Sequence, residues 1–228
     1  MKAVLLAGGK GRRLKPFTTT IPKPLFPIGE KPILQVIIEQ LKNFGVDEYI
    51  ISLGYLGQLI KAFLGNGEKY NTEISYVSEE IPLGTAGAIS LLPKLDDDYI
   101  FMNGDILSTI DYNDAYEKHK KSNALMTICT FEKTTKSSLG VLELNINGEV
   151  ENYLEKPELK QIVSSGIYIL NPKIKDYIPQ NKFFDIPDLV KSLIVKKEKI
   201  NTYKIEGEWF DIGTPADLEK AEQYLLKK

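Results

Sequence analysis

Short apolar runs alternate with helix-like periodicity through the first half of the chain. Residues 3–7 and 49–53 are apolar runs that end at a glycine, as buried parallel strands do. Between them, residues 33–44 place apolar side chains three or four positions apart and stop at Gly45. The same alternation continues with predicted strands at 73–77 and 99–102 and predicted helices at 58–64 and 86–92. Such alternation predicts right-handed βαβ units with helices on both faces of a parallel sheet.

The second half of the chain is richer in strand patterns. Predicted strands lie at 124–131, 140–144, 150–154, 165–170 and 200–205, and predicted helices at 173–178, 186–195 and 215–226. The dipeptide Asn147-Gly148 indicates a hairpin. Since no linker or repeat separates the halves, the pattern predicts an α/β fold: one Rossmann-like domain over 1–228, with a mixed, mostly parallel central sheet flanked by helices.

Composition and charge narrow the class of partner. The 228 residues are 43% hydrophobic and 26% charged, which excludes a disordered, collagen-like or disulfide-framed chain. The formal net charge of −2 gives no basic field for nucleic acid. No run approaches the about 20 apolar residues of a membrane span, and no secretory signal is apparent. The single cysteine, Cys129, also fits a reducing compartment, so we expect a cytoplasmic protein without nucleic-acid or membrane partners.

A glycine-rich loop with several cations follows the first predicted strand. Residues 8–15 read Gly-Gly-Lys-Gly-Arg-Arg-Leu-Lys, so backbone N–H groups and mobile cations could surround phosphate oxygens. Leu14 stands where the dinucleotide fingerprint needs its third glycine, and no Gly-Lys-Ser/Thr follows for a phosphate loop of that type. The alternative is a tight turn with exposed lysines.

Proline flanks Lys23 on both sides, in the sequence Pro22-Lys23-Pro24. Because proline fixes φ and disfavours a helix, the pattern predicts an extended chain that aims one exposed ammonium group at a fixed point. The alternative is an ordinary proline-rich loop.

Six segments in order resemble the motifs of sugar-1-phosphate nucleotidylyltransferases. They are residues 8–18 with 22–25, 82–87, 103–105, 155–157, 165–168 and 209–215. The resemblance is greatest to the short single-domain mannose-1-phosphate and manno-heptose-1-phosphate guanylyltransferases and to N-acetylmuramate-1-phosphate uridylyltransferase. It implies a transferase that joins a nucleoside triphosphate and a sugar-1-phosphate into a nucleotide-sugar and pyrophosphate with Mg²⁺, a step in nucleotide-sugar biosynthesis that serves cell-surface polysaccharide. The nucleotide-binding half would be about 1–120 and the sugar-binding half about 121–228.

The resemblance also implies residue roles. Arg13 would hold the β- and γ-phosphates, Lys23 the α-phosphate in the transition state, and Lys156 the phosphate of the sugar, while Asp105 and Asp211 would hold Mg²⁺. The implied nucleotide-binding residues are Leu6, Ala7, Gly8, Gly9, Gly11, Arg12, Arg13, Pro82, Gly84, Thr85, Asn103 and Gly104. The implied sugar-binding residues are Gly140, Glu155, Lys156 and Ser165. Trp209 could cover the site or belong to the core.

Departures from the family pattern bear on the substrate. Arg12 stands where relatives have Thr or Ser, and Ser165 where several have Asn. Pro22-Lys23-Pro24 differs from the form typical of thymidylyltransferases. We therefore favour GTP with a mannose- or manno-heptose-type sugar-1-phosphate. UTP or another triphosphate with N-acetylmuramate-1-phosphate or glucose-1-phosphate is the alternative.

Two other classes of function remain as alternatives. A non-catalytic relative would bind nucleotide-sugars and regulate a partner, but such a chain could lose Arg13, Lys23 or Asp105, and none is lost here. A glycosyltransferase would favour a D-x-D metal motif, yet residues 96–98 precede a predicted strand instead of following one. His119 is expected on a solvated helix face and Cys129 as a buried, inert thiol.

The motifs extend from residue 6 to residue 218. The catalytic core is therefore expected to fill the chain, without the C-terminal β-helix of larger relatives. The protein is expected to be a monomer or a homodimer.

Overall fold

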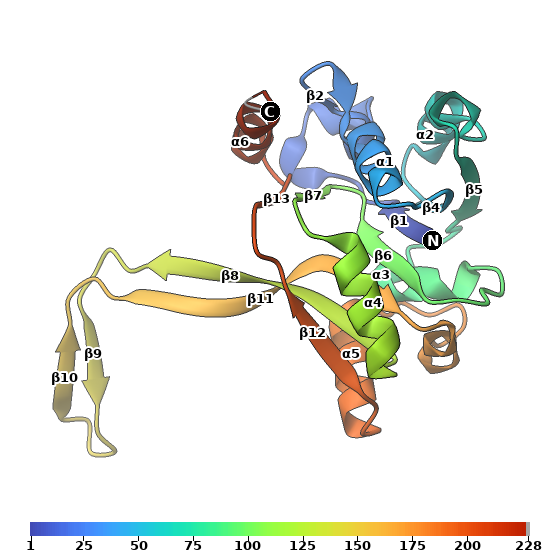
Figure 1. Cartoon of the computed structure of the whole chain (residues 1–228). Helices are drawn as coiled ribbons and strands as arrows, with labels where there is room; N and C mark the ends of the chain where they lie inside the picture. The colour runs from blue at the N-terminus through green and yellow to red at the C-terminus, as the bar shows by residue number, and fades with distance from the viewer. Residues whose placement is uncertain (227–228) are drawn as a thin grey trace.

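A seven-stranded sheet forms the centre of the protein, seen in a computed structural model that describes residues 1–226 (Figure 1). Its strand order is β12 (Ile200–Lys204), β8 (Met126–Lys136), β11 (Glu158–Leu170), β6 (Tyr99–Asn103), β1 (Lys2–Ala7), β4 (Glu48–Leu53) and β5 (Glu73–Ser78). Only β11 among these seven runs antiparallel to its neighbours. The predicted α/β fold with a mixed, mostly parallel sheet is confirmed.

Helices cover both faces of this sheet because the strand residues alternate between two apolar clusters. In β1, Ala3 and Leu5 face one cluster and Val4 faces the other. The first cluster is completed by α1 (Ile33–Asn43), α2 (Gly57–Leu64), α4 (Tyr112–Ser122) and α6 (Pro215–Leu225), and the second by α3 (Gly84–Gly87) and α5 (Ile186–Val195). Two predicted helices are shorter or tighter than expected: 86–92 splits into α3 and a 3₁₀ turn, and Pro172–Tyr177 is 3₁₀. None of the described helices is long and apolar enough to cross a membrane.

Three small two-stranded sheets lie outside the central one. They pair β7 (Ile106–Ser108) with β13 (Trp209–Asp211), β9 (Val141–Leu144) with β10 (Val150–Leu154), and β2 (Pro27–Ile28) with β3 (Lys31–Pro32). The β7–β13 pair is antiparallel and sets Asp211 opposite Ile106. Two segments more than a hundred positions apart in sequence therefore meet beside the end of β6.

A long arm leaves the body at β8 and β11. We define the arm as residues 132–163: the outer parts of these two strands and the hairpin β9–β10 at their tip (Figure 1). At its base the pairing is irregular, because β11 advances from Ser164 to Tyr168 while β8 moves only from Thr130 to Ile128. This bulge separates the register of the core sheet from that of the arm.

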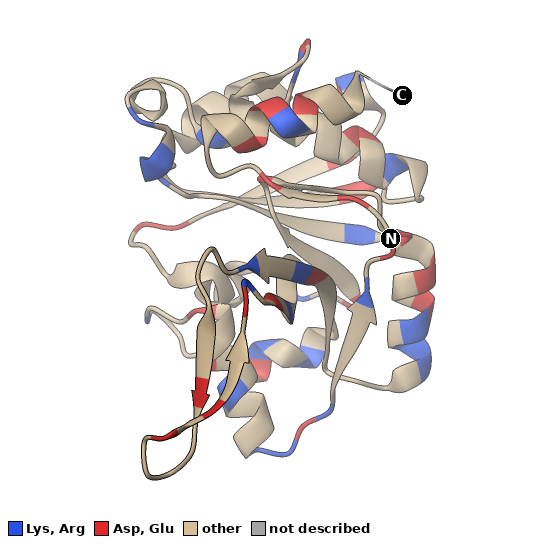
Figure 2. Ribbon diagram, turned by 90° about the vertical axis from the view of Figure 1, so that its left-hand side faces the viewer, with Lys and Arg blue, Asp and Glu red and all other residues tan. Residues whose placement is uncertain are grey.

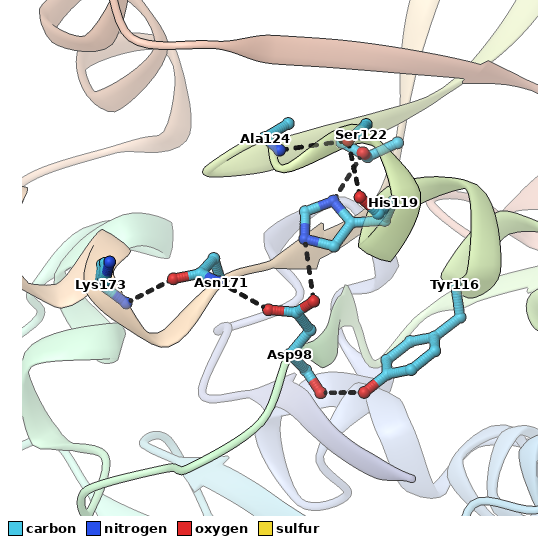
Figure 3. Close-up of polar contacts among 8 residues, drawn as sticks. Asp98, Tyr116, His119, Ser122, Ala124, Asn171 and Lys173 are labelled. Carbon is cyan, nitrogen blue, oxygen red and sulfur yellow. Dashed lines mark hydrogen bonds and ion pairs between the residues drawn. The ribbon is translucent and has the colours of Figure 1, made fainter.

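His119 is buried, contrary to the solvated helix face expected from the charged residues around it. Only 1% of it is exposed, and its Nδ1 lies 2.7 Å from Thr127 Oγ1. Its Nε2 lies 3.7 Å from Asp98 Oδ2, and Asp98 also accepts a hydrogen bond from Asn171 Nδ2 (Figure 3). The expectation was wrong because the apolar face of α4 turns His119 against β8, a contact between distant parts of the chain.

Candidate active site

The glycine-rich loop follows β1 at the carboxyl end of the sheet. It turns at Gly11, whose φ of 56° is a conformation that favours glycine. A Cβ at this position would lie 2.7 Å from Thr18 Cγ2, and the Thr18 hydroxyl donates to Gly11 O at 3.0 Å. Glycine is therefore required here both by the backbone and by the close approach of Thr18.

Lys23 differs from its expected state in two respects. Residues Lys23–Leu25 form a 3₁₀ turn after an extended Pro22, instead of a continuous extended segment. Prolines are tolerated because the first N–H groups of such a turn have no partner within it. The side chain is also buried, with 8% of the residue exposed, and its ammonium group is paired with the Asp105 carboxylate. The extended, exposed Lys23 predicted from the prolines is therefore wrong.

Asp105 and Asp211 converge as the sequence predicts for strand-end carboxylates. Asp105 ends the turn after β6, its backbone oxygen accepts from Ile212 N at 3.0 Å, and Asp211 closes β13. Burial, and next the charge of Asp105, raise the pKa of Asp211 above its ordinary value. Asp105 Oδ1 is buried and has no hydrogen-bond partner among the described residues. The negative charge of the two carboxylates is therefore only partly balanced by the nearby Lys23 ammonium group.

A cavity of about 230 Å³ lies between the glycine loop and Asp105. Its lining includes Leu6, Ala7, Gly9, Gly11, Arg12, Arg13, Lys23, Gly104, Asp105 and Gly213. The Arg13 guanidinium lies against the backbone after β13, since a Cβ at Gly213 would be 2.6 Å from Arg13 Nη1. Cations and backbone N–H groups on one side, and on the other the Asp105 carboxylate with Asp211 electrostatically coupled to it, suit a phosphate chain with a divalent cation.

A second cavity, of about 310 Å³, continues from the first along Leu6 and Gly9. Its lining also includes Gly8, Glu79, Pro82, Gly84, Thr85, Asn103, Phe183 and Asp185. The backbone and hydroxyl of Thr85 donate to Asp185 Oδ1 at 2.8 and 3.0 Å, and Glu79 accepts from Leu83 N at 2.9 Å. The glycines in this lining have no side chains, so they leave room for a flat ring such as a nucleobase against the backbone.

Glu79 and Asp185 were missed from the sequence. Asp185 begins α5 with a capping box that includes Asp188, and this Asp-x-x-Asp pattern marks a helix start. That signal could have located Asp185 as an N-cap but not as a partner of Thr85, one hundred positions away. Glu79 has no comparable local signal.

All twelve residues expected to bind nucleotide line one of the two cavities. The structure does not bring three of the expected sugar-binding residues to them. Gly140, Glu155 and Lys156 lie on the exposed arm (Figure 1). The fourth, Ser165, is buried, and its hydroxyl donates to Cys129 O at 2.8 Å.

Trp209 lies at the base of the arm. Its ring stacks on Phe131 with 5.4 Å between the centroids, and its Nε1 donates to Ser165 O at 2.8 Å. It is half-buried, so it takes part in packing without being fully enclosed. Cys129 is buried nearby, and burial raises the pKa of its thiol to about 12, as expected for an inert cysteine.

No group of three or more His, Cys, Asp or Glu side chains within residues 1–226 could hold a metal by itself. Asp105 and Asp211 would need phosphate or water oxygens to complete the coordination of Mg²⁺, which commonly keeps such ligands.

Comparison with known proteins agrees with this geometry. A family model described as nucleotidyl transferase matches residues 2–228. The chain is 32% identical to a UTP–glucose-1-phosphate uridylyltransferase of Synechocystis, over 100% of this chain and 64% of that protein. It is 34% identical to a mannose-1-phosphate guanyltransferase of Schizosaccharomyces pombe, over 95% of this chain and 62% of that protein.

A solved structure is similar over nearly its whole length. HddC from Yersinia pseudotuberculosis, complexed with GMP-PN, superposes with a TM-score of 0.74 and 30% identity, covering 98% of this chain and 99% of that one. By contrast, the chain spans about two thirds or less of the length of the curated relatives that it matches. The match over residues 2–228 shows that the chain belongs to the nucleotidyl transferase family.

Proposed function

We propose that this protein transfers a nucleotidyl group to a sugar-1-phosphate. A phosphate oxygen of the sugar attacks the α-phosphorus of a nucleoside triphosphate, the bond to the β-phosphate oxygen breaks, and pyrophosphate leaves with that electron pair. The attacking oxygen is already anionic, so no general base is needed. The observation that carries the proposal is the pair of adjoining cavities, one lined by cations and the Asp105 carboxylate and one lined in large part by small residues.

The main catalytic task is to bring two polyanions together in line. Arg13 would hold the β- and γ-phosphates, because it lines the cavity of about 230 Å³, which we call the phosphate cavity. Lys23 would compensate charge at the α-phosphate as the transition state forms. Its pairing with Asp105 fixes the ammonium group before substrate arrives. Lys156 would bind the phosphate of the sugar.

Mg²⁺ fits the carboxylate pair. Asp105 Oδ1 is buried without a partner and Asp211 carries a raised pKa, so both would gain from a nearby cation. When bound, Mg²⁺ would supply positive charge to the phosphate oxygens. Asp105 and Asp211 would hold it, and Lys23 would position Asp105 through their ion pair.

Among substrates, we favour GTP with a mannose- or manno-heptose-type sugar-1-phosphate. The support is the similarity to HddC in complex with GMP-PN over almost the whole of both chains. A second candidate is UTP with glucose-1-phosphate, which the similarity to the uridylyltransferase of Synechocystis favours.

A pyrophosphate-release assay tests the proposal. The protein is incubated with Mg²⁺, one of GTP, UTP, ATP, CTP or dTTP, and one of a panel of sugar-1-phosphates. We expect release only with a matched pair, and fastest with GTP and a manno-configured sugar. Faster release with UTP and glucose-1-phosphate would support the second candidate instead. No release from any pair would contradict nucleotidyl transfer altogether.

A further inference from the structure

The arm is exposed along its length. Its side-chain ion pairs and hydrogen bonds join residues of the arm itself, such as Lys136 with Glu158 at 2.7 Å and Tyr153 Oη to Glu155 at 2.9 Å. Figure 1 shows the arm standing away from the helices and the central sheet. Counted at about 3.4 Å per strand residue, the outer part of β8 alone carries the tip roughly 20 Å from the body.

One face of the tip hairpin is apolar and open to solvent. The pairing sets Leu142 opposite Tyr153 and Leu144 opposite Val150, so these four side chains share a face. They are 52–60% exposed. An isolated two-stranded hairpin is at best marginally stable in water, and it needs a surface to pack on. The hairpin of this arm therefore indicates a partner that the single chain does not supply.

The charge of the hairpin points to the kind of surface that it fits. Residues 137–157 contain four glutamates and one lysine, and Figure 2 shows the acidic positions along the hairpin. The rim of the phosphate cavity has the opposite charge, because residues 8–24 contain five cations and no acidic residue. The same rim exposes apolar side chains at Phe17 and Ile21, which are 63% and 45% exposed. An acidic hairpin with an apolar face is complementary to this rim.

The hairpin is poorly placed to reach the rim of the phosphate cavity in its own chain. The β8–β11 ladder runs without interruption from Thr130 and Ser164 to Lys136 and Glu158, so the arm is a stiff ribbon directed away from the body. Returning the tip to its own cavity would require this ladder to break or fold over. A second copy could receive the tip without any change in the ladder, and exchange of equal elements is a low-cost route to a symmetric dimer.

We propose that two copies of this chain exchange arms, so that the tip hairpin of each lies on the rim of the other's phosphate cavity and supplies Lys156 to it. The role of Lys156 in this inference rests on the proposed function. Docking of the hairpin rests only on its exposed apolar face and on the opposite charges of hairpin and rim.

Analytical ultracentrifugation of the full chain tests the docking. Wild type is expected to be a dimer at micromolar concentration, and the double variant Leu142→Lys/Leu144→Lys a monomer. Both residues are exposed, so the variant is expected to fold, which circular dichroism would check. Leu59→Lys is the matched control, since Leu59 is exposed on α2, and it should remain dimeric. A monomeric wild type, or a dimer that the double variant leaves intact, would overturn the proposal.

Complementation tests whether the site is shared. Lys23→Ala disables the body of one chain and Lys156→Ala the arm of another, and each variant alone is expected to be inactive. After mixing and exchange, half of the dimers are mixed and each contains one complete site, so about one quarter of wild-type activity should return. No recovery from a mixed dimer would show that each site uses its own arm and would overturn the exchange.

The two proposals can fail separately. If the wild type turns over no substrate pair, nucleotidyl transfer fails and ultracentrifugation alone decides the exchange. If Lys156→Ala is fully active, the supply of Lys156 in trans is overturned. If the wild type is active as a monomer, the exchange fails while nucleotidyl transfer stands.

Discussion

At the scale of single residues, the candidate site is built from charges that constrain one another. Lys23 is paired with Asp105, burial and then the charge of Asp105 raise the pKa of Asp211, and Arg13 lies against the loop that follows Asp211. A change at any of these positions therefore alters the electrostatic state of its neighbours as well as a contact with substrate.

Replacing Lys23 by alanine should lower kcat by about 10²–10³, the usual cost of removing one fixed donor from a transition state. The nucleotide dissociation constant should change far less, because other groups hold the triphosphate. Steady-state kinetics and equilibrium binding of a non-hydrolysable triphosphate measure the two effects. Lys31→Ala, at an exposed lysine paired with Glu39, is the control. A kcat within a few-fold of wild type would contradict the role of Lys23.

Replacing Asp211 by asparagine should abolish the response of the rate to Mg²⁺ and yet raise the melting temperature at neutral pH. Burial and the charge of Asp105 raise the pKa of Asp211 above 3.8, so its ionised form costs stability in the folded state. Below 3.8 the group is protonated in both states and the cost is absent; it develops as pH rises through the raised pKa. The gain in melting temperature should therefore shrink as pH falls toward 4, which calorimetry in EDTA measures.

Asp217→Asn is the control for that result. Burial raises the pKa of Asp217, but the hydrogen bonds that it accepts from Thr214 outweigh this effect and lower it. Its ionised form caps α6, so this variant should be less stable than wild type at neutral pH. If both variants had a higher melting temperature, removing any negative charge in this region would raise stability, and the result for Asp211→Asn would not be specific to its raised pKa.

At the scale of elements, turns and helix packing fix the positions of the site residues. Gly84, the first residue of α3, borders the second cavity with a φ of +79° and packs closely against the start of α5. The packing of α4 on β8 similarly buries His119, whose Nδ1 lies beside the hydroxyl of Thr127.

Gly84→Ala should destabilise the fold by about 1–3 kcal/mol and weaken nucleotide binding. Its Cβ would lie 2.7 Å from Asp185 Oδ1, in addition to the strain of the positive φ. Gly45→Ala is a matched control, because its φ is +80° and no atom lies within 4 Å of the added Cβ. Urea unfolding measures both variants. Equal losses would show that backbone strain alone matters and that the contact with Asp185 does not.

Stability should fall as pH drops from 7 to 5, in part because of His119. Burial lowers the pKa of His119 below 6.5, against the opposing effect of Asp98, so the unfolded chain takes up this proton first. Stability from this group is complete above 6.5 and declines toward the lower folded pKa. In His119→Gln, the urea midpoint should depend less on pH over this range. An unchanged dependence would assign it to other groups.

At the scale of the whole molecule, the net charge of −2 conceals a local excess of cations. The first 29 residues contain six cations and no acidic residue, and the phosphate cavity lies among them. Attraction of a polyanion therefore depends on this part of the surface and on the salt around it.

Raising ionic strength from about 0.05 M to about 0.5 M should raise KM for the triphosphate several-fold, because screening shortens the reach of these cations. The kcat should change much less, since Lys23 is buried. Initial rates across potassium chloride concentrations measure both. The same series with an uncharged osmolyte controls for water activity, and a KM that ignores salt would contradict long-range attraction.

The sequence predicted the parts of this molecule that depend on contiguous patterns. The residues expected to bind nucleotide lie at or after the ends of β1, β5 and β6, where strand ends can be located from apolar runs. It did not predict the ion pair of Lys23, because the partner is 82 positions away. Strands as short as β7 and β13 show no periodicity, so only the structure reveals how they bring Asp211 to Asp105. The exposed course of the arm is likewise a tertiary feature.

The bulge between Ser164 and Tyr168 makes the arm an independent module in evolutionary terms. It absorbs a change of register at the base, so residues added in pairs to the outer β8 and β11 would lengthen the arm without moving any strand of the core. Each pair would also keep the same side chains on the same face. A lineage could thus vary the reach of the hairpin, and the surface that it meets, while the chemistry of the cavity stays unchanged.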